Sequence, residues 1–267
     1  MLVDHITIMG KLRESLLKGV MFWVFVFAAI PAALLWAGDL ERARQLYQRT
    51  EYEAALQALG AAGSQDVRVL LLAGQIYYQL GKYEEALEQL EKASQLEPGS
   101  AEIFLWLGRS LGRRAETSSF FTAPGYARQC RKALEQAVAL DGKNVEAMSA
   151  LASYYVKAPS ALGGGPEKAE KLVARIAALD AAKGQYVQAQ IAAHLEDFSR
   201  AEEHLRRAAE MAPDSPKLMF ARAELYIQQK RKLEEARVLL RRYLQMPLTP
   251  EDPPRWEAER LLAEAGG

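Results

Sequence analysis

The sequence is poor in the residues from which most enzyme and metal sites are built. Its 267 residues include one cysteine, Cys130, and three histidines. One cysteine excludes an intramolecular disulfide, so cysteine usage does not identify the redox compartment. No nucleophile elbow, paired-cysteine motif or dinucleotide-binding fingerprint occurs in the sequence. We therefore expect no catalytic residue, no metal, no cofactor and no enzyme activity of the chain itself.

An excess of charge of either sign is also missing. Lys and Arg together number 34, and Asp and Glu together number 34. This balance produces no overall positive field that would favour nucleic acid as a partner. The specificity of binding must therefore come from local patches of side chains.

Three features of the sequence could be interpreted as chemical sites, but none of them matches the pattern that such a site requires. His194 and His204 lie close in sequence, but the H-E-x-x-H spacing of a zinc site is absent, so we expect surface histidines. The triple glycine 163–165, followed by Pro166, lacks the spacing and the hydroxyl of a Walker loop, and it predicts an inter-helix loop. Cys130 is expected to pack as a small buried apolar side chain.

The N-terminal residues 1–37 have the layout of an export signal. Residues 19–37 contain no charge, and basic side chains precede them. The segment is either a signal peptide cleaved after Ala37 or an uncleaved membrane anchor, since about 20 apolar residues span a bilayer. In both cases the positive flank stays inside, so we expect an exported domain. It would be periplasmic, or anchored in the inner membrane and facing the periplasm.

The remaining chain repeats a pattern of aromatic and small residues. An aromatic residue stands three positions before an alanine, and a proline stands twelve positions after that alanine. The two best instances are Tyr83, Ala86 and Pro98, and then Phe198, Ala201 and Pro213. Gly74 and Gly108 lie 34 residues apart. A period of 34 residues built from two short helices resembles the tetratricopeptide repeat.

The resemblance to exported bacterial tetratricopeptide repeat proteins implies an all-α fold. The expected architecture is a right-handed α-α superhelix of about six helix-turn-helix units with a C-terminal capping helix, in a single solenoid domain over 38–267. The units span 38–64, 67–100, 101–144, 145–180, 182–215 and 216–249, and the capping helix spans 253–265. Inserts interrupt the third unit near 117–125 and the fourth near 157–166.

In this family the first helix of each pair lines the concave surface, so its side chains outside the core point into a groove. The residues expected there are Gln75, Tyr78, Arg109, Arg113, Ser153, Lys157, Tyr186 and Gln190. Arg109 and Arg113 lie one helical turn apart, so both can meet one carboxylate-bearing ligand. Chaperone-binding members of the family hold a terminal carboxylate with Lys and Asn. Here Leu71 and Gln75 stand at those positions, so that use is not expected.

We predict a non-enzymatic protein-protein interaction scaffold of the cell envelope, which binds a protein or an extended peptide in the groove. The partner would be another envelope protein, with no nucleic acid and with membrane contact only through the N-terminal segment if it is uncleaved. The alternative is a small-ligand-binding accessory protein of a transport or secretion system. Inserts folded across the groove would favour the alternative, whereas solvated inserts would favour the scaffold.

Overall fold

The computed structural model describes residues 39–60 and 65–266, and all regular structure in this part of the chain is helical. Residues 39–48 form a helix that precedes the labelled ones. The labelled helices are α2 (Tyr52–Leu59), α3 (Val67–Gln79), α4 (Tyr83–Leu96), α5 (Ala101–Thr117), α6 (Ala123–Leu140), α7 (Val145–Lys157), η1 (Ser160–Leu162), α8 (Pro166–Leu179), α9 (Ala181–His194), α10 (Phe198–Met211), α11 (Pro216–Gln228), α12 (Leu233–Gln245) and α13 (Arg255–Glu264). The predicted export segment 1–37 lies outside the described residues. Within them, no helix has the length and apolar character needed to cross a membrane.

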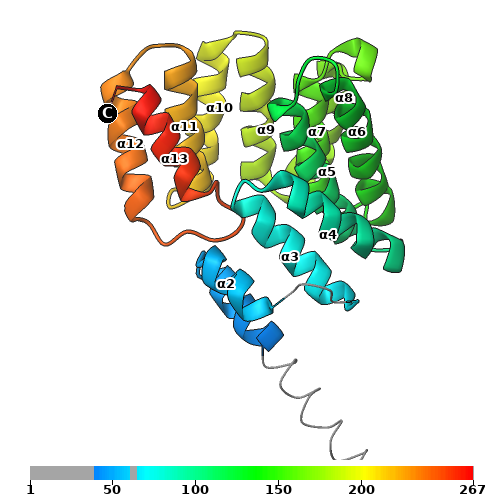
Figure 1. Ribbon diagram of the computed structural model, residues 1–267. Helices are drawn as coiled ribbons and strands as arrows, with labels where there is room; N and C mark the ends of the chain where they lie inside the picture. The colour runs from blue at the N-terminus through cyan, green and yellow to red at the C-terminus, as the bar shows by residue number, and fades with distance from the viewer. Residues whose placement is uncertain (1–38, 61–64, 267) are drawn as a thin grey trace, which may run out of the picture.

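The helices pair into hairpins that follow one another around a superhelix (Figure 1). The pairs are α3 with α4, α5 with α6, α7 with α8, α9 with α10 and α11 with α12. Each pair packs against the next one, and α13 covers α11 and α12 at the C-terminal end. The predicted all-α superhelix is therefore confirmed.

Capping side chains determine where the first helix of units two to six begins. They are Asp66 for α3, Ser100 for α5, Asn144 for α7, Asp180 for α9 and Ser215 for α11. Each accepts a hydrogen bond from a backbone N–H two or three residues later. Such caps satisfy donors that have no partner within the helix. They therefore place the first turn of each of these helices at a defined point of the repeat.

Glycine allows the two helices of a hairpin to approach closely. A Cβ atom at Gly74 of α3 would lie 2.5 Å from Cγ of Leu90 in α4. The equivalent Cβ at Gly108 of α5 would lie 2.5 Å from Leu134 Cδ2 in α6. The 34-residue spacing of these glycines thus reflects the same helix contact in units two and three. The leucines that fill the space are buried.

The turns inside four of the units contain a residue in the left-handed region. These residues are Thr50 (φ 59°), Gly81 (φ 73°), Glu196 (φ 58°) and Lys230 (φ 51°). Of the four, Gly81 takes this conformation without the steric cost of a Cβ atom. Units three and four, which carry the inserts, connect their helices by longer segments, and that of unit four also holds a left-handed residue, Gly163 (φ 87°).

The insert of unit three lengthens both helices of its hairpin. α5 has 17 residues and α6 has 18, against 13 and 14 in α3 and α4. Residues 123–125 of the expected insert therefore belong to α6. At the short tip of the hairpin Phe120 and Phe121 are 86% and 91% exposed. The insert of unit four instead forms η1, where the hydroxyl of Tyr154 donates to the carbonyl of Leu162 at 2.8 Å.

The close helix approach leads to a prediction on two glycines. Gly74→Ala is expected to lower the free energy of unfolding by about 1–3 kcal/mol, because Leu90 must shift to admit the methyl group. Gly112→Ala in α5 is the matched control, since its Cβ would lie 3.4 Å from Cys130 Sγ, an ordinary contact. There the higher helix propensity of alanine should raise stability by up to about 1 kcal/mol. Urea denaturation followed by circular dichroism measures both changes, and equal effects would contradict the packing argument.

Candidate functional site

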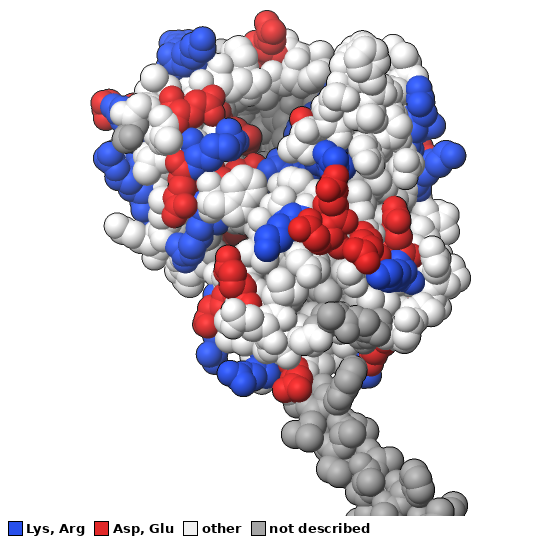
Figure 2. All heavy atoms as spheres, viewed as in Figure 1, with Lys and Arg blue, Asp and Glu red and all other residues white. Residues whose placement is uncertain are grey.

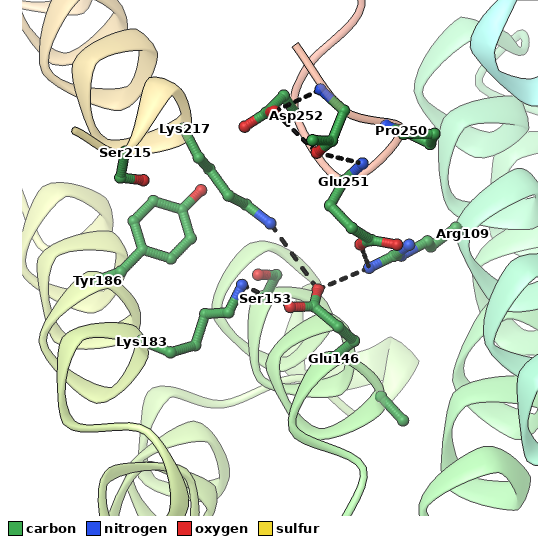
Figure 3. A network of polar contacts seen from close by, with 12 residues as sticks. Arg109, Glu146, Ser153, Lys183, Tyr186, Ser215, Lys217, Pro250, Glu251 and Asp252 are labelled. Atoms are coloured by element: carbon green, nitrogen blue, oxygen red, sulfur yellow. Dashed lines mark hydrogen bonds and ion pairs between the residues drawn. The ribbon is translucent and has the colours of Figure 1, made fainter. Parts of the chain in front are cut away.

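Glu146 lies at the centre of a charged cluster that joins the first helices of four consecutive units (Figure 3). Its carboxylate lies 2.8 Å from the guanidinium of Arg109 in α5 and 2.6 Å from Nζ of Lys183 in α9. Nζ of Lys217 in α11 approaches it to 3.8 Å. We call these four side chains the Glu146 cluster, and we call the surface shared by α3, α5, α7, α9 and α11 the inner face.

The cluster holds more positive than negative charge. Burial alone would raise the pKa of Glu146, but attraction from Lys217, Lys183 and Arg109 outweighs it and lowers the pKa to about 2. Glu146 is therefore ionised under all ordinary conditions. Burial lowers the pKa of Lys217, against the attraction of Glu146, and the two neighbouring cations add to this lowering. A second carboxylate, that of Glu251, lies 3.6 Å from the guanidinium of Arg109.

A second charged group follows one turn further along α5. Arg113 Nε donates to the hydroxyl of Tyr83 at 3.1 Å, and its other nitrogens lie 3.1 Å from Glu116 and 2.7 Å from Glu257. Burial alone would lower the pKa of this guanidinium. The carboxylate of Glu257 and the nearby tyrosines raise it by more, so the pKa of Arg113 lies above its ordinary value. Arg109 and Arg113 therefore contact different carboxylates of the chain, and their predicted contact with one carboxylate-bearing ligand stays a prediction. Each is paired with carboxylates of the chain itself.

A cleft of about 420 Å³ opens on the inner face between α5 and α7. Small and apolar residues form its walls, among them Gly108 and Gly112 of α5, Cys130 and Leu134 of α6, and Ala150 of α7. Leu162 of η1 borders it, so the insert of unit four contributes to the cleft. Figure 2 shows this side of the molecule hollowed in its middle, with basic and acidic side chains around the hollow.

Four basic side chains line the cleft beside its apolar walls. Arg109, Arg113, Lys157 and Lys217 all line the cleft, together with Glu116 and Glu146. The hydroxyl of Ser149, which also lines it, is buried and has no hydrogen-bond partner among the described residues. An apolar cavity with a basic edge and an unpaired hydroxyl is suited to bind an apolar group that is linked to a negative charge.

Six of the eight residues predicted for the groove line this cleft. They are Tyr78, Arg109, Arg113, Ser153, Lys157 and Tyr186. Gln190 lies behind them, where it accepts from Ser153 at 2.8 Å and donates to the hydroxyl of Tyr186 at 3.1 Å. Gln75 is apart from the others. It bonds to Glu102 at 2.9 Å and lines a second cleft, of about 590 Å³, beside the first unit.

Sequence reasoning missed three members of the Glu146 cluster. Glu146, Lys183 and Lys217 each occupy the first turn of a first helix. They are separated by 37 and 34 residues, close to the repeat period. The prediction considered only later turns of these helices, so a search of every turn at that period would have found them. Glu251 and Glu257 had no such signal, because they lie beyond the last repeat.

Cys130, His194 and His204 were considered above for a chemical role, and their surroundings are those of core or surface side chains. Cys130 is buried in the wall of the cleft, and burial raises the pKa of its thiol to about 12. His204 lies 2.8 Å from the side chain of Gln185, and His194 is exposed. Across residues 39–60 and 65–266, no three metal-ligating side chains form a group that could hold an ion.

The charge of Glu146 leads to a prediction on acid stability. Glu146→Gln is expected to lower the free energy of unfolding at neutral pH by about 2–3 kcal/mol, because it removes the carboxylate that Arg109, Lys183 and Lys217 share. In the native protein this stabilisation is complete above the ordinary pKa of 4.5 and is lost as the pH falls towards about 2. The variant should therefore lose less stability than the native chain between these values. Urea denaturation over a pH series measures this.

Glu85→Gln, an exposed position on α4, is the control for the loss of one carboxylate. It should follow the native pH profile. If Glu146→Gln also follows it, the cluster does not account for the acid stability.

The comparisons with known proteins agree with this architecture. A family model described as TPR repeat matches residues 74–113, and another described as Tetratricopeptide repeat matches residues 161–216 and 186–253. A comparison with curated protein sequences found no match.

Two solved structures are similar to the chain in fold. A thermophilic TPR protein of Thermus thermophilus has a TM-score of 0.60 at 20% identity, and the match covers 73% of this chain and 98% of that one. A tetratricopeptide repeat protein of Parabacteroides merdae has a TM-score of 0.50 at 14% identity, with 88% and 100% covered. At these identities the likeness concerns the fold alone.

Proposed function

Because the chain is a tetratricopeptide repeat protein, we propose that it acts as a non-enzymatic scaffold whose cleft binds an extended segment of another protein. The fold supports a role in protein-protein interaction in general. The observation that supports this particular site is the cleft of about 420 Å³ with apolar walls and a basic edge.

The lining of the cleft indicates which kind of segment would fit. An apolar side chain would pack between Gly112, Cys130 and Ala150. Acidic side chains next to it would meet Lys157 and Lys217 at the edge. Ser149 would gain a partner for its buried hydroxyl from the backbone of the bound segment. The proposed ligand is therefore an extended segment that carries an apolar residue with acidic neighbours.

Lys217 supports a binding role because its charge opposes folding. Its lowered pKa means that the folded state holds the proton less tightly than the unfolded state does. The resulting cost is fully present below the lowered pKa and disappears as the pH rises through the ordinary value of about 10.5. A charge that is kept at such a cost, at the edge of a cleft, is typical of a functional site.

The alternative, a pocket for a small ligand, requires inserts that cover the groove. The tip of the unit-three insert, residues 118–122, does not line the cleft, and Phe120 and Phe121 are exposed. The insert of unit four borders the cleft through Pro159 and Leu162. A groove bordered by one insert and left uncovered by the other fits an extended ligand better than an enclosed one.

Photo-crosslinking tests the proposed site. A photoreactive amino acid in place of Ser153, inside the cleft, is expected to capture an envelope protein in living cells. Lys217→Met in the same chain should reduce this capture at least tenfold without loss of stability, since it removes a buried charge. Lys171→Met, at an exposed position of α8, is the matched control and should leave capture unchanged.

The same photoreactive amino acid in place of Lys171 on α8 measures how much of the partner is captured away from the inner face. Capture of the same protein with equal yield from Lys171 and from Ser153 would contradict a site on the inner face. So would capture from Ser153 that is unaffected by Lys217→Met.

We also propose that the scaffold works outside the cytoplasm. The uncharged segment 19–37, after basic residues, supports this. A reporter enzyme that is active only outside the cytoplasm, fused after Gly267, is expected to be active in the full chain. Deletion of residues 19–37 should abolish that activity. Equal activity with and without the segment would contradict export.

A further inference from the structure

The segment that joins α12 to α13 lies against units two and three, far from it in sequence (Figure 1). We call residues 249–257, which include the first three residues of α13, the clasp. The side-chain amide of Gln79, at the end of α3, donates to the carbonyl of Pro250 at 2.6 Å. The backbone carbonyl of Gln79 in turn accepts from the indole N–H of Trp256 at 2.9 Å. Gln79 thus forms one hydrogen bond with Pro250 near the start of the clasp and one with Trp256 near its end.

Acidic side chains of the clasp meet the basic side chains of the inner face. Glu257 lies 2.7 Å from Arg113, and Glu251 lies 3.6 Å from Arg109. Figure 3 shows the turn that contains Pro250 and Glu251 facing Arg109. The two arginines also line the cleft. The clasp therefore occupies the part of the inner face next to the cleft.

The shape of the clasp is maintained without help from units two and three. The carboxylate of Asp252 accepts from both the N–H and the hydroxyl of Thr249 at 2.9 Å, which closes the turn locally. Prolines at 250, 253 and 254 restrict the backbone. Such a segment has little conformational entropy to lose when it binds.

The contacts of the clasp with units two and three comprise hydrogen bonds, ion pairs and the ring of Trp256, which lies next to Gly81. The apolar side chains on either side of it, Leu248 and then Ala258 and Leu261, belong to a core cluster of the C-terminal helices. Water can replace hydrogen bonds and ion pairs at small net cost. The clasp can therefore leave units two and three while both apolar cores stay intact.

We propose that units two and three bind an acidic, proline-containing extended segment of the partner, and that the clasp is the chain's own occupant of this position. This inference rests on the proposed function, and it specifies the chemistry of the segment that the scaffold binds. Because the clasp is tethered, its effective concentration is about millimolar. A partner must therefore displace it, and access to Arg109 and Arg113 is regulated by the clasp.

A peptide with the clasp sequence tests this. The probe is a fluorescent synthetic peptide of residues 247–258, P-L-T-P-E-D-P-P-R-W-E-A. The protein is the full chain, either native or with Trp256→Ala and Glu257→Gln. Fluorescence anisotropy should show at least tenfold tighter binding to the double variant, because its own clasp competes less. Glu257→Gln alone, which leaves the apolar contacts of α13 in place, should give a smaller gain.

Two controls assign the binding to the inner face. Glu259→Gln changes an exposed carboxylate on the same helix and should bind the probe as weakly as the native chain. Arg113→Gln, added to the double variant, should reduce its binding at least tenfold. A probe with Gln at the position of Glu257 should also bind the double variant at least tenfold more weakly.

The inference is overturned if the probe binds the native chain and the double variant equally, if it binds neither, or if binding does not depend on Arg113. Each result leaves the crosslinking test at Ser153 intact, because Ser153 does not contact the clasp through any described hydrogen bond. Loss of crosslinking at Ser153 together with tight probe binding would instead reject the proposed cleft and keep the clasp.

Discussion

The close approach of the two helices in each hairpin is the constraint on which the rest of the structure depends. Where Gly74 and Gly108 leave room for a leucine, the second helix sits directly behind the first. The first helices then share one face, and their caps align their first turns. Glu146, Lys183 and Lys217 meet for this reason, although 34 or more residues separate each from the next.

The charges gathered on the inner face are a poor means of stabilising a fold. Burying an ion pair removes two charges from water, and an apolar set of similar volume is often as stable. Here three cations face the carboxylates of Glu146 and Glu251, and the pKa of Lys217 is lowered by burial. The same cations border an apolar cleft. Their arrangement therefore supports the proposed binding surface.

The architecture could be predicted from the sequence because it depends on local contacts repeated at one period. Glycine, alanine and proline recur at positions that a helical hairpin requires, and these alone indicate the superhelix. The residues of the inner face were partly predictable for the same reason, since Arg109 and Lys157 follow from helix periodicity. Sequence reasoning could not place Glu251 and Glu257 beside those helices. That contact joins positions more than 140 residues apart, and it depends on the summed curvature of units three to six rather than on any one of them.

The contact between Gln79 and Pro250 also affects how the chain unfolds. An open solenoid behaves as a line of units, each coupled only to its neighbours, so its ends fray first. A bond between the second unit and the segment after the last one turns that line into a ring. In a ring, unit two and the last unit share in the cooperativity of the units between them. Release of the bond would then act on the dynamics of both ends at once.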